Sequence, residues 1–399
     1  MGYTAGVPTG HHRARRKERP VRVDAATRID AGLDDVLAWL TEPCAEFDLW
    51  RNGIRQSAQS HLAHFVETRA VPQLGRTGVE IVPDVLIRFV EGGKCLRSTF
   101  MYLGWQCGPD AGPDAEAAAL RAAAGLEMLH AFALLQDDVM DDSPLRRGRP
   151  AAHVSFAEWH RERGFAGSAD RFGAALAVLL SDLCLVWAEQ MMRESGVPAA
   201  ALDRAWPRYD AMRVELAVGQ VADVANDAGA APTLDAVLDV ARRKSGNYTV
   251  RRPLEIGAAM AGREDLLEAL GGYGGLIGEA FQLRDDLIGV FGAPELTGKP
   301  AGGDLAERKA TSVVVAAQRM ADPGVRRQFT ELSQAEALSP SDIAHWRTLI
   351  VATGAPAWIE TMINERVAEA LSLIADVRID DAVRVRLARM ADLCTRRTT

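Results

Sequence analysis

The chain of 399 residues is poor in cysteine, and its five cysteines form no pair with the spacing of a metal or redox motif. An odd number of cysteines without CxxC spacing argues against a disulfide framework and against a zinc site. Cys184 lies within an apolar run, which favours core packing over catalysis. We therefore expect the thiols to stay reduced, as they do in the cytoplasm.

Long hydrophobic runs are also lacking. No stretch of about 18 uninterrupted apolar residues occurs, so we expect no transmembrane segment. Residues 11–20 (HHRARRKERP) are basic, but no apolar stretch follows them as it would in a secretory signal. We interpret residues 1–30 as a disordered basic N-terminal arm.

The sequence also lacks an excess of basic charge and the alternating patterns of β-strands. The formal net charge is −8, which argues against a nucleic-acid partner. Apolar residues recur at spacings of four, as between Leu120, Ala124 and Met128, and of three, as between Leu126 and Leu129. We expect Gly- and Pro-rich segments such as residues 108–115 and 271–275 to separate the helical stretches. The pattern predicts an all-α fold in which residues 31–399 form a single large helical domain with buried central helices.

The first chemically informative segment is a cluster of four aspartates: Asp137, Asp138, Asp141 and Asp142. An apolar, helix-forming stretch precedes the cluster, and a helix places Asp137 and Asp141 on one face, one turn apart. Such carboxylates repel each other and need a compensating charge, for which a divalent cation is suited. A solvated acidic helix end is the alternative.

A second acidic pair, Asp285 and Asp286, lies inside the otherwise apolar segment of residues 281–292. A solvated face is a poor explanation here, because apolar residues surround the pair. Two Asp-bearing helices in one helical protein indicate carboxylates that face each other across a cavity. Because Mg²⁺ takes a few carboxylates and completes its shell with water and phosphate oxygens, this arrangement fits a diphosphate held through Mg²⁺.

Basic residues lie beside glycine breaks and beside the acidic clusters. Lys94 and Arg97 follow Gly92 and Gly93, and Arg146 and Arg147 follow the first aspartates. Other basic residues occur in the segments KSGNY, TGKPAGGD and ERKAT: Lys244, Lys299 and Lys309. Arginine and lysine are the usual direct contacts of phosphate groups. The glycine-rich segment departs from the P-loop pattern GxxxxGK[ST], so nucleotide binding is not favoured.

Taken together, these motifs resemble the trans-polyprenyl diphosphate synthases, which include farnesyl and geranylgeranyl diphosphate synthases. The elements GGKxxR, ExxHxxxLxxDDxxD, RRGxP, GQxxD, KxxxY, FQxxDD and GK…D…KxT follow one another in the family's order between residues 83 and 311. The resemblance implies an isoprenoid-synthase fold around a central apolar cavity. It also implies a homodimer, and isopentenyl diphosphate and an allylic diphosphate as substrates.

The family's functional positions transfer to this chain motif by motif. By resemblance, Asp137, Asp141 and Asp285 would hold Mg²⁺, with roughly three ions present when substrate is bound. Residues matching the isopentenyl diphosphate site are Lys94, Arg97, His130 and Arg147. Residues matching the allylic diphosphate site are Arg146, Lys244, Ser245, Gln282, Lys299 and Lys309. The chain's GQVAD segment supplies Gln220 and Asp223 to the same cavity. The catalytic set implied in this way is Asp137, Asp141, Asp285, Lys244 and Lys309.

The chain departs from the family's pattern at several positions. Where the family usually has Arg, Pro, His, Asp and Gly, this chain has Cys95, Ser98, Gln136, Gly289 and Arg308. The loss of an arginine at position 95 removes a charge near the isopentenyl diphosphate site.

The implied reaction is electrophilic alkylation, in which the allylic C–O bond ionises and the double bond of isopentenyl diphosphate attacks C1. Product length would follow the depth of the cavity along the helix that precedes the first aspartates. Phe132 lies five positions before Asp137 and would form the cavity floor, with the small Ala133 beside it. These two residues favour geranylgeranyl diphosphate as the product.

Three other interpretations remain open at this stage. A class I terpene cyclase shares the metal chemistry and the helical fold, but it would not need the GGKxxR and RRG elements. A non-catalytic regulatory subunit of a synthase should have lost aspartates, whereas both pairs are present. An acidic helical interaction module would explain the composition but not the order of the motifs.

Overall fold

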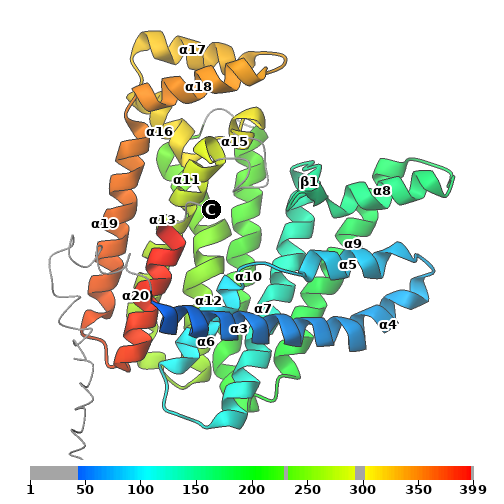
Figure 1. Cartoon of the computed structure of the whole chain (residues 1–399), viewed down its shortest axis with the longest axis vertical. Helices are drawn as coiled ribbons and strands as arrows, with labels where there is room; N and C mark the ends of the chain where they lie inside the picture. Colours follow the sequence, from blue (N-terminus) through cyan, green and yellow to red (C-terminus); the bar gives the residue numbers. More distant parts are fainter. Residues whose placement is uncertain (1–43, 229–231, 293–301, 397–399) are drawn as a thin grey trace, which may run out of the picture.

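A computed structural model describes residues 44–228, 232–292 and 302–396, and most of them are helical (Figure 1). In chain order the elements are α3 (Ala45–Phe65), η1 (Val66–Ala70), α4 (Val71–Leu74), η2 (Gly75–Thr77), α5 (Ile81–Val90), α6 (Leu96–Gln106), α7 (Pro113–Met140), β1 (Leu145–Arg146), β2 (Arg149–Pro150), α8 (Ala152–Glu162), α9 (Ala169–Arg193), α10 (Ala199–Ala228), α11 (Leu234–Ala241), η3 (Arg242–Arg251), α12 (Arg252–Met260), η4 (Glu264–Leu266), α13 (Leu267–Phe291), α15 (Gly303–Ala306), α16 (Ser312–Met320), α17 (Pro323–Gln334), α18 (Pro340–Ala352), α19 (Ala355–Ala375) and α20 (Asp381–Thr395). The all-α prediction is confirmed, with one two-residue antiparallel hairpin, β1–β2, as the exception in the described part. The expected helix break at residues 271–275 is wrong, because these residues lie inside α13, where Gly274 allows a close approach of the Arg251 backbone. The predicted basic arm lies outside the described residues, and the domain boundary at residue 31 stays a prediction.

Local sequence explains where the long helices begin. Helix α7 starts with Pro113 after Gly112, and Asp114 and Glu116 lie in its first turn, where carboxylates complement the helix dipole. Helix α9 begins after Ser168, whose hydroxyl accepts a hydrogen bond from the backbone N–H of Arg171. These sequences fix the start of α7, which carries part of the cavity wall, and of α9, which packs against α7.

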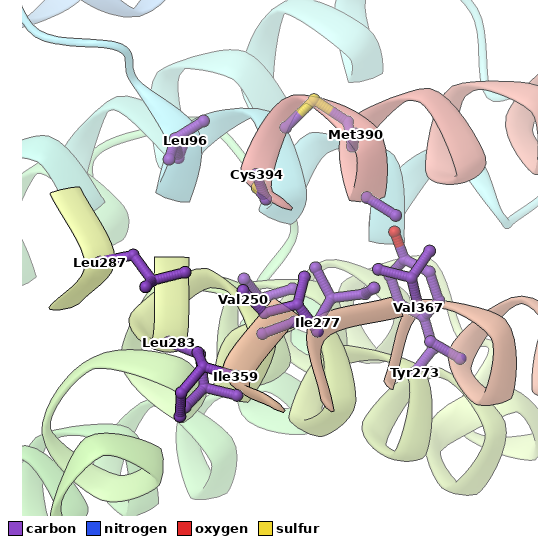
Figure 2. Close-up of a cluster of buried hydrophobic side chains, with 14 of the residues drawn as sticks. Leu96, Val250, Tyr273, Ile277, Leu283, Leu287, Ile359, Val367, Met390 and Cys394 are labelled. Carbon is purple, nitrogen blue, oxygen red and sulfur yellow. The ribbon is translucent and has the colours of Figure 1, made fainter. Parts of the chain in front are cut away.

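The hydrophobic core has two main parts. One contains buried residues of α7, α9 and α10, and the other lies between α13, α19 and α20. Figure 2 shows the second part, where Ile277 and Tyr273 of α13 lie close to Val367 of α19 and Met390 of α20. The Tyr273 hydroxyl donates to the carbonyl oxygen of Leu387 at 2.7 Å, which satisfies its buried polar group. The packing makes α13 a rigid support for the second acidic pair.

The helix η3 is a ten-residue π-helix that lies against α13. The two backbones come together at Gly246 and Gly278, where a Cβ atom on Gly278 would lie 2.5 Å from the Cα atom of Gly246. No side chain fits between them at that point. Lys244 and Ser245 of η3 line the same cavity as Gln282 and Asp285 of α13.

Two described helices, α7 and α9, are long and apolar enough to cross a membrane by length and composition alone. The apolar window of α7 is 61% buried within the protein, as expected for a core helix, whereas that of α9 is 39% buried. The expectation that no segment spans a membrane therefore stays a prediction.

Candidate active site

A cavity of about 1600 Å³ lies between α7, α10, η3 and α13. Its lining contains the residues that the motifs indicated: Lys94, Arg97, His130, Phe132, Ala133, Asp137, Asp141, Arg146, Arg147, Gln220, Asp223, Lys244, Ser245, Gln282, Asp285 and Lys309. They come from segments far apart in sequence. Lys299 lies outside the described residues.

At the C-terminal end of α7, the aspartates of the first cluster have two different roles. Asp137 and Asp141 line the cavity, whereas Asp138 is fully buried and is not part of the lining. Arg146 donates from Nε to Asp138 Oδ1 at 2.9 Å, and its Nη2 lies 3.8 Å from Asp137 Oδ2. Burial raises the pKa of Asp138, and the hydrogen bond from Arg146 opposes that rise. Asp138 thus anchors Arg146 beside the two cavity-facing carboxylates.

Two lysines pair with the cavity-facing aspartates. Lys244 Nζ lies 2.9 Å from Asp137 Oδ1 and 2.6 Å from Asp223 Oδ2. Burial alone would lower the pKa of Lys244, but the carboxylates of Asp137 and Asp223 outweigh it and raise that pKa above its ordinary value. The lysine is therefore a fixed positive charge at neutral pH.

Lys309 forms the corresponding pair with Asp141, one helical turn further along α7. Its Nζ lies 3.0 Å from Asp141 Oδ2 and 3.0 Å from Glu307 Oε2. Burial opposes the charge, but the two carboxylates raise the pKa of Lys309. Each aspartate of the first motif thus has a cation that a phosphate group can share.

The two members of the second acidic pair, Asp285 and Asp286, also have different roles. Asp285 lines the cavity, together with Asp286 and Gln282. Asp286 is buried and accepts hydrogen bonds from Ser312 N at 2.9 Å, from Ser312 Oγ at 2.6 Å and from Gln282 Nε2 at 2.8 Å. Burial raises the pKa of Asp286, while its hydrogen bonds oppose the rise. Asp286 therefore ties α16 to α13, and Asp285 is the member of the pair suited to a ligand.

Gly289 follows Asp285 by one helical turn, and a third carboxylate occupies the space beside it. A Cβ atom at Gly289 would overlap the carboxylate of Asp304, which belongs to α15 and also lines the cavity. At position 289 this chain has glycine where the family usually has aspartate. The structure supplies a carboxylate there from a different segment.

The basic end of the cavity contains Lys94, Arg97 and Arg147. Arg97 donates from Nη2 to Thr249 Oγ1 at 3.0 Å, and its guanidinium lies 4.2 Å from the centre of the Tyr248 ring. Arg147 donates from Nη1 to the carbonyl oxygen of Glu91 at 2.7 Å. These contacts fix the direction of both guanidinium groups.

His130 lies at the same end, and its Nδ1 atom is buried without a hydrogen-bond partner among the described residues. Burial lowers the pKa of His130 well below its ordinary value, and the positive charges of Arg97, Arg147 and Arg146 lower it further. His130 is therefore neutral at physiological pH and is suited to hydrogen bonding rather than to charge pairing.

Phe132 and Ala133 both line the cavity on α7, before the aspartates. The carbonyl oxygen of Phe132 accepts a hydrogen bond from Ser181 Oγ of α9 at 3.1 Å, which joins the two helices at this level. The apolar part of the lining continues along α10 with Leu216, Ala217 and Val221. An apolar chain that starts at the aspartates would meet Phe132 and this wall.

The motifs missed several lining residues. Glu127 accepts hydrogen bonds from Ser98 N at 3.1 Å and Ser98 Oγ at 2.9 Å, and the first of these explains why a residue with an N–H suits position 98. Glu127 and Tyr248 were present in the motif patterns but were given no role. Arg51 and Arg55 of α3 line the cavity without any motif, and no sequence signal marks them.

The carboxylates of the cavity fit a divalent cation that is shared with a ligand. Asp137, Asp141 and Asp285 offer the hard oxygen donors that Mg²⁺ prefers. Across the described ranges, no group of three or more His, Cys, Asp or Glu side chains is close enough to hold a metal without other ligands. Such a donor set suits Mg²⁺ that completes its shell with phosphate oxygens and water.

Known proteins share both the sequence and the fold. A profile of the family described as polyprenyl synthetase matches residues 79–350. The chain is 31% identical over 294 residues to geranylgeranyl diphosphate synthase of Mycobacterium tuberculosis, covering 73% of this chain and 77% of that one. It is 32% identical over 305 residues to (2E,6E)-farnesyl diphosphate synthase of Mycobacterium bovis, covering 75% and 78%.

A solved structure agrees with these matches. Geranylgeranyl pyrophosphate synthase of Corynebacterium glutamicum, in complex with isoprenyl diphosphate and magnesium, superposes with a TM-score of 0.80 at 34% identity and covers 86% of this chain and 99% of that one. The resemblance suggested by the motifs is therefore confirmed. The chain belongs to the polyprenyl synthetase family, the trans-polyprenyl diphosphate synthases, which are transferases that elongate prenyl chains.

Proposed function

We propose that this chain condenses isopentenyl diphosphate with an allylic diphosphate in a Mg²⁺-dependent reaction and that its main product is geranylgeranyl diphosphate. The observation that carries the proposal is that Asp137, Asp141 and Asp285 line one cavity, where Lys244 pairs with Asp137 and Lys309 pairs with Asp141. The apolar wall that begins at Phe132 then offers a place for the growing chain.

Asp137, Asp141 and Asp285 would hold Mg²⁺, which supplies charge neutralisation to the leaving diphosphate when it is bound. Lys244 and Lys309 would share the same negative charge, and their raised pKa values keep them protonated. Gln282, Ser245 and Arg146 border this region, and Lys299 is proposed for it from its motif alone. The allylic C–O bond breaks, the new C–C bond forms at C1, and a proton passes to the released diphosphate.

The basic end would bind isopentenyl diphosphate. Lys94, Arg97 and Arg147 provide cations, and neutral His130 provides a hydrogen bond. Because this end lies in the same cavity as the aspartates, both substrates can be held with their reacting carbons close together. This second diphosphate site is the feature that distinguishes a synthase from a class I terpene cyclase.

Geranylgeranyl diphosphate is the product that Phe132 and Ala133 support. Relatives named for geranylgeranyl and for farnesyl diphosphate match this chain with nearly equal identity, so similarity does not decide the length. Phe132 would stop the chain, and the small Ala133 leaves room beside it.

We further propose a homodimer in the cytoplasm. Helix α9 exposes Val178, Leu179, Leu183 and Val186, and α10 exposes Val214 and Val218 outside the cavity lining. An ion pair between Arg213 of α10 and Glu189 of α9 connects the two helices, and exposed apolar groups of this kind mark interaction surfaces. A second copy would cover them, and Val214→Glu should then convert the protein to monomers in analytical ultracentrifugation. The cytoplasmic location is supported by the five free cysteines.

The reaction is tested by incubating purified protein with labelled isopentenyl diphosphate, Mg²⁺ and dimethylallyl, geranyl or farnesyl diphosphate in turn. Mass spectrometry of the products should give geranylgeranyl diphosphate as the longest main product. Longer or shorter diphosphates would keep the enzyme class and contradict the role of Phe132. Conversion of an allylic diphosphate alone to a hydrocarbon would favour the cyclase, and no reaction at all would favour a regulatory subunit.

A further inference from the structure

Helix α3 brings two arginines to the basic end of the cavity. Arg51 and Arg55 lie one helical turn apart and line the cavity in company with Lys94 and Arg97. The helix is fixed in place because its next turns bury Ala58 and Leu62 against α7. The two arginines are therefore held at the cavity by a packed helix and not by a loop.

Arg55 supports the glycine turn that precedes Lys94. Its Nε donates to the carbonyl oxygen of Gly93 at 2.9 Å, and Gln59 Nε2 donates to the carbonyl oxygen of Gly92 at 2.8 Å. Gly92 and Gly93 have φ values of 79° and 84°, which other residues rarely adopt. Helix α3 thus holds the turn that directs Lys94 towards the cavity.

Arg51 has a buried group with no acceptor. Its Nε atom is buried and finds no hydrogen-bond partner among the described residues, and no described carboxylate pairs with Arg51. A buried guanidinium N–H without an acceptor is unfavourable by the cost of its lost hydration. An anionic ligand in the cavity would remove that cost.

The basic end of the cavity, where Arg51 lies, carries an excess of positive charge. The thiol of Cys95 lies in the electrostatic field of Arg55, Arg97 and Arg147 and of one carboxylate, that of Glu127. The Oε1 atom of Glu127 already accepts two hydrogen bonds from Ser98. Three cations against one carboxylate, with Arg51 beside them, match the charge of a diphosphate group.

We propose that Arg51 binds the diphosphate of isopentenyl diphosphate directly and that Arg55 positions the Gly92–Gly93 turn of the same site. The proposal rests on the proposed function and adds two residues from α3 to it. The positive charge that the motif lacks at Cys95 is then supplied through space by a helix that precedes the motif.

The test compares Arg51→Gln with the wild type in two measurements. The first is the KM for isopentenyl diphosphate in the elongation assay, which should rise about tenfold or more while the KM for farnesyl diphosphate stays the same. The second is calorimetric binding of isopentenyl diphosphate without an allylic primer, in which the Kd should rise by a similar factor. The control is Arg88→Gln, which makes the same change at an exposed position of α5 outside the cavity lining.

Arg51→Lys and the Arg55 variants separate direct binding from positioning. Arg51→Lys should recover part of the affinity because the charge is kept. Arg55→Gln and Arg55→Lys should both raise the KM for isopentenyl diphosphate, because lysine keeps the charge but cannot reproduce the Nε contact with Gly93. A Kd for Arg51→Gln within about twofold of the wild type would overturn the proposal. If the wild type binds isopentenyl diphosphate but does not elongate any primer, the proposed function fails and the calorimetric comparison still decides the role of Arg51.

Discussion

The carboxylate of Asp304 occupies the space that a side chain at Gly289 would need. The glycine and the aspartate are 15 positions apart in the chain, yet α15 brings the carboxylate against the last turns of α13. The glycine in the second aspartate motif is therefore part of a local arrangement in which a different segment provides the carboxylate.

Gly289→Asp, which restores the third aspartate of the motif, should lower activity. Two carboxylates would compete for one volume, so Asp304 would be displaced and like charges would repel. We expect kcat to fall about tenfold. Gly53→Ala is the control, because a Cβ atom at Gly53 meets nothing within 4 Å. An activity equal to or above that of the wild type would contradict the role given to Asp304.

The two members of the second acidic pair should respond differently to substitution. Asp286→Ala removes the acceptor of three buried hydrogen bonds and should lower the free energy of unfolding by about 1–3 kcal/mol. Asp285→Asn should abolish most activity and leave the unfolding midpoint in urea almost unchanged. Equal loss of stability in both variants would contradict the division of the pair.

Lys244→Met should reduce kcat by about 100-fold or more, because a fixed cation beside the leaving diphosphate is lost. The same change leaves Asp137 and Asp223 without their ion-pair partner, so circular dichroism and thermal unfolding must confirm that the variant folds. Arg243→Met is a matched control, because Arg243 is the exposed neighbour whose ion pair is with Asp239. A kcat close to that of the wild type in Lys244→Met would remove Lys244 from the catalytic set.

His130 gives a pH dependence of stability with a definite sign. Its pKa in the folded protein lies well below the ordinary value of 6.5, so the unfolded chain binds the proton more readily. The contribution of His130 to the free energy of unfolding is therefore fully present above pH 6.5. It decreases as the pH falls below 6.5, because the unfolded chain then takes up the proton. Between pH 7.5 and pH 5, the wild type should therefore lose more thermal stability than His130→Gln. Parallel curves for the two proteins would contradict the neutral, buried state of His130.

Phe132→Ala should lengthen the product by one or more five-carbon units, because the apolar path along α7 and α10 would then be longer. Ala133→Phe should have the opposite effect and shorten the product. Chain length is measured by mass spectrometry of the dephosphorylated products. An unchanged product distribution in both variants would show that another part of the wall sets the length.

The sequence predicted the fold class and most of the cavity because these features depend on spacing within single helices. Asp137 and Asp141 are one turn apart on α7, and the apolar context of Asp285 could be seen without any structure. The family's motif order then brought the basic residues into the same prediction. The order of the family's motifs also predicted which aspartates face the cavity.

What the sequence did not reveal depends on contacts between distant segments. Arg51 and Arg55 face the cavity because α3 packs across α7, and no short pattern records that packing. Asp304 belongs to the GK…D…KxT element, but the motif alone assigned it no role. Arg308 stands where glycine is common, and its φ of 54° shows the backbone requirement that makes glycine common there.

The measurement that tests the central claim most directly is elongation of farnesyl diphosphate by labelled isopentenyl diphosphate as a function of Mg²⁺ concentration, in the wild type and in Asp285→Asn. We predict that the wild type forms the elongated diphosphate only with Mg²⁺, that EDTA abolishes the product, and that Asp285→Asn requires about tenfold or more Mg²⁺ for any product. Undiminished elongation in EDTA, or an unchanged Mg²⁺ requirement in Asp285→Asn, would contradict the claim that these carboxylates hold the diphosphate through the metal.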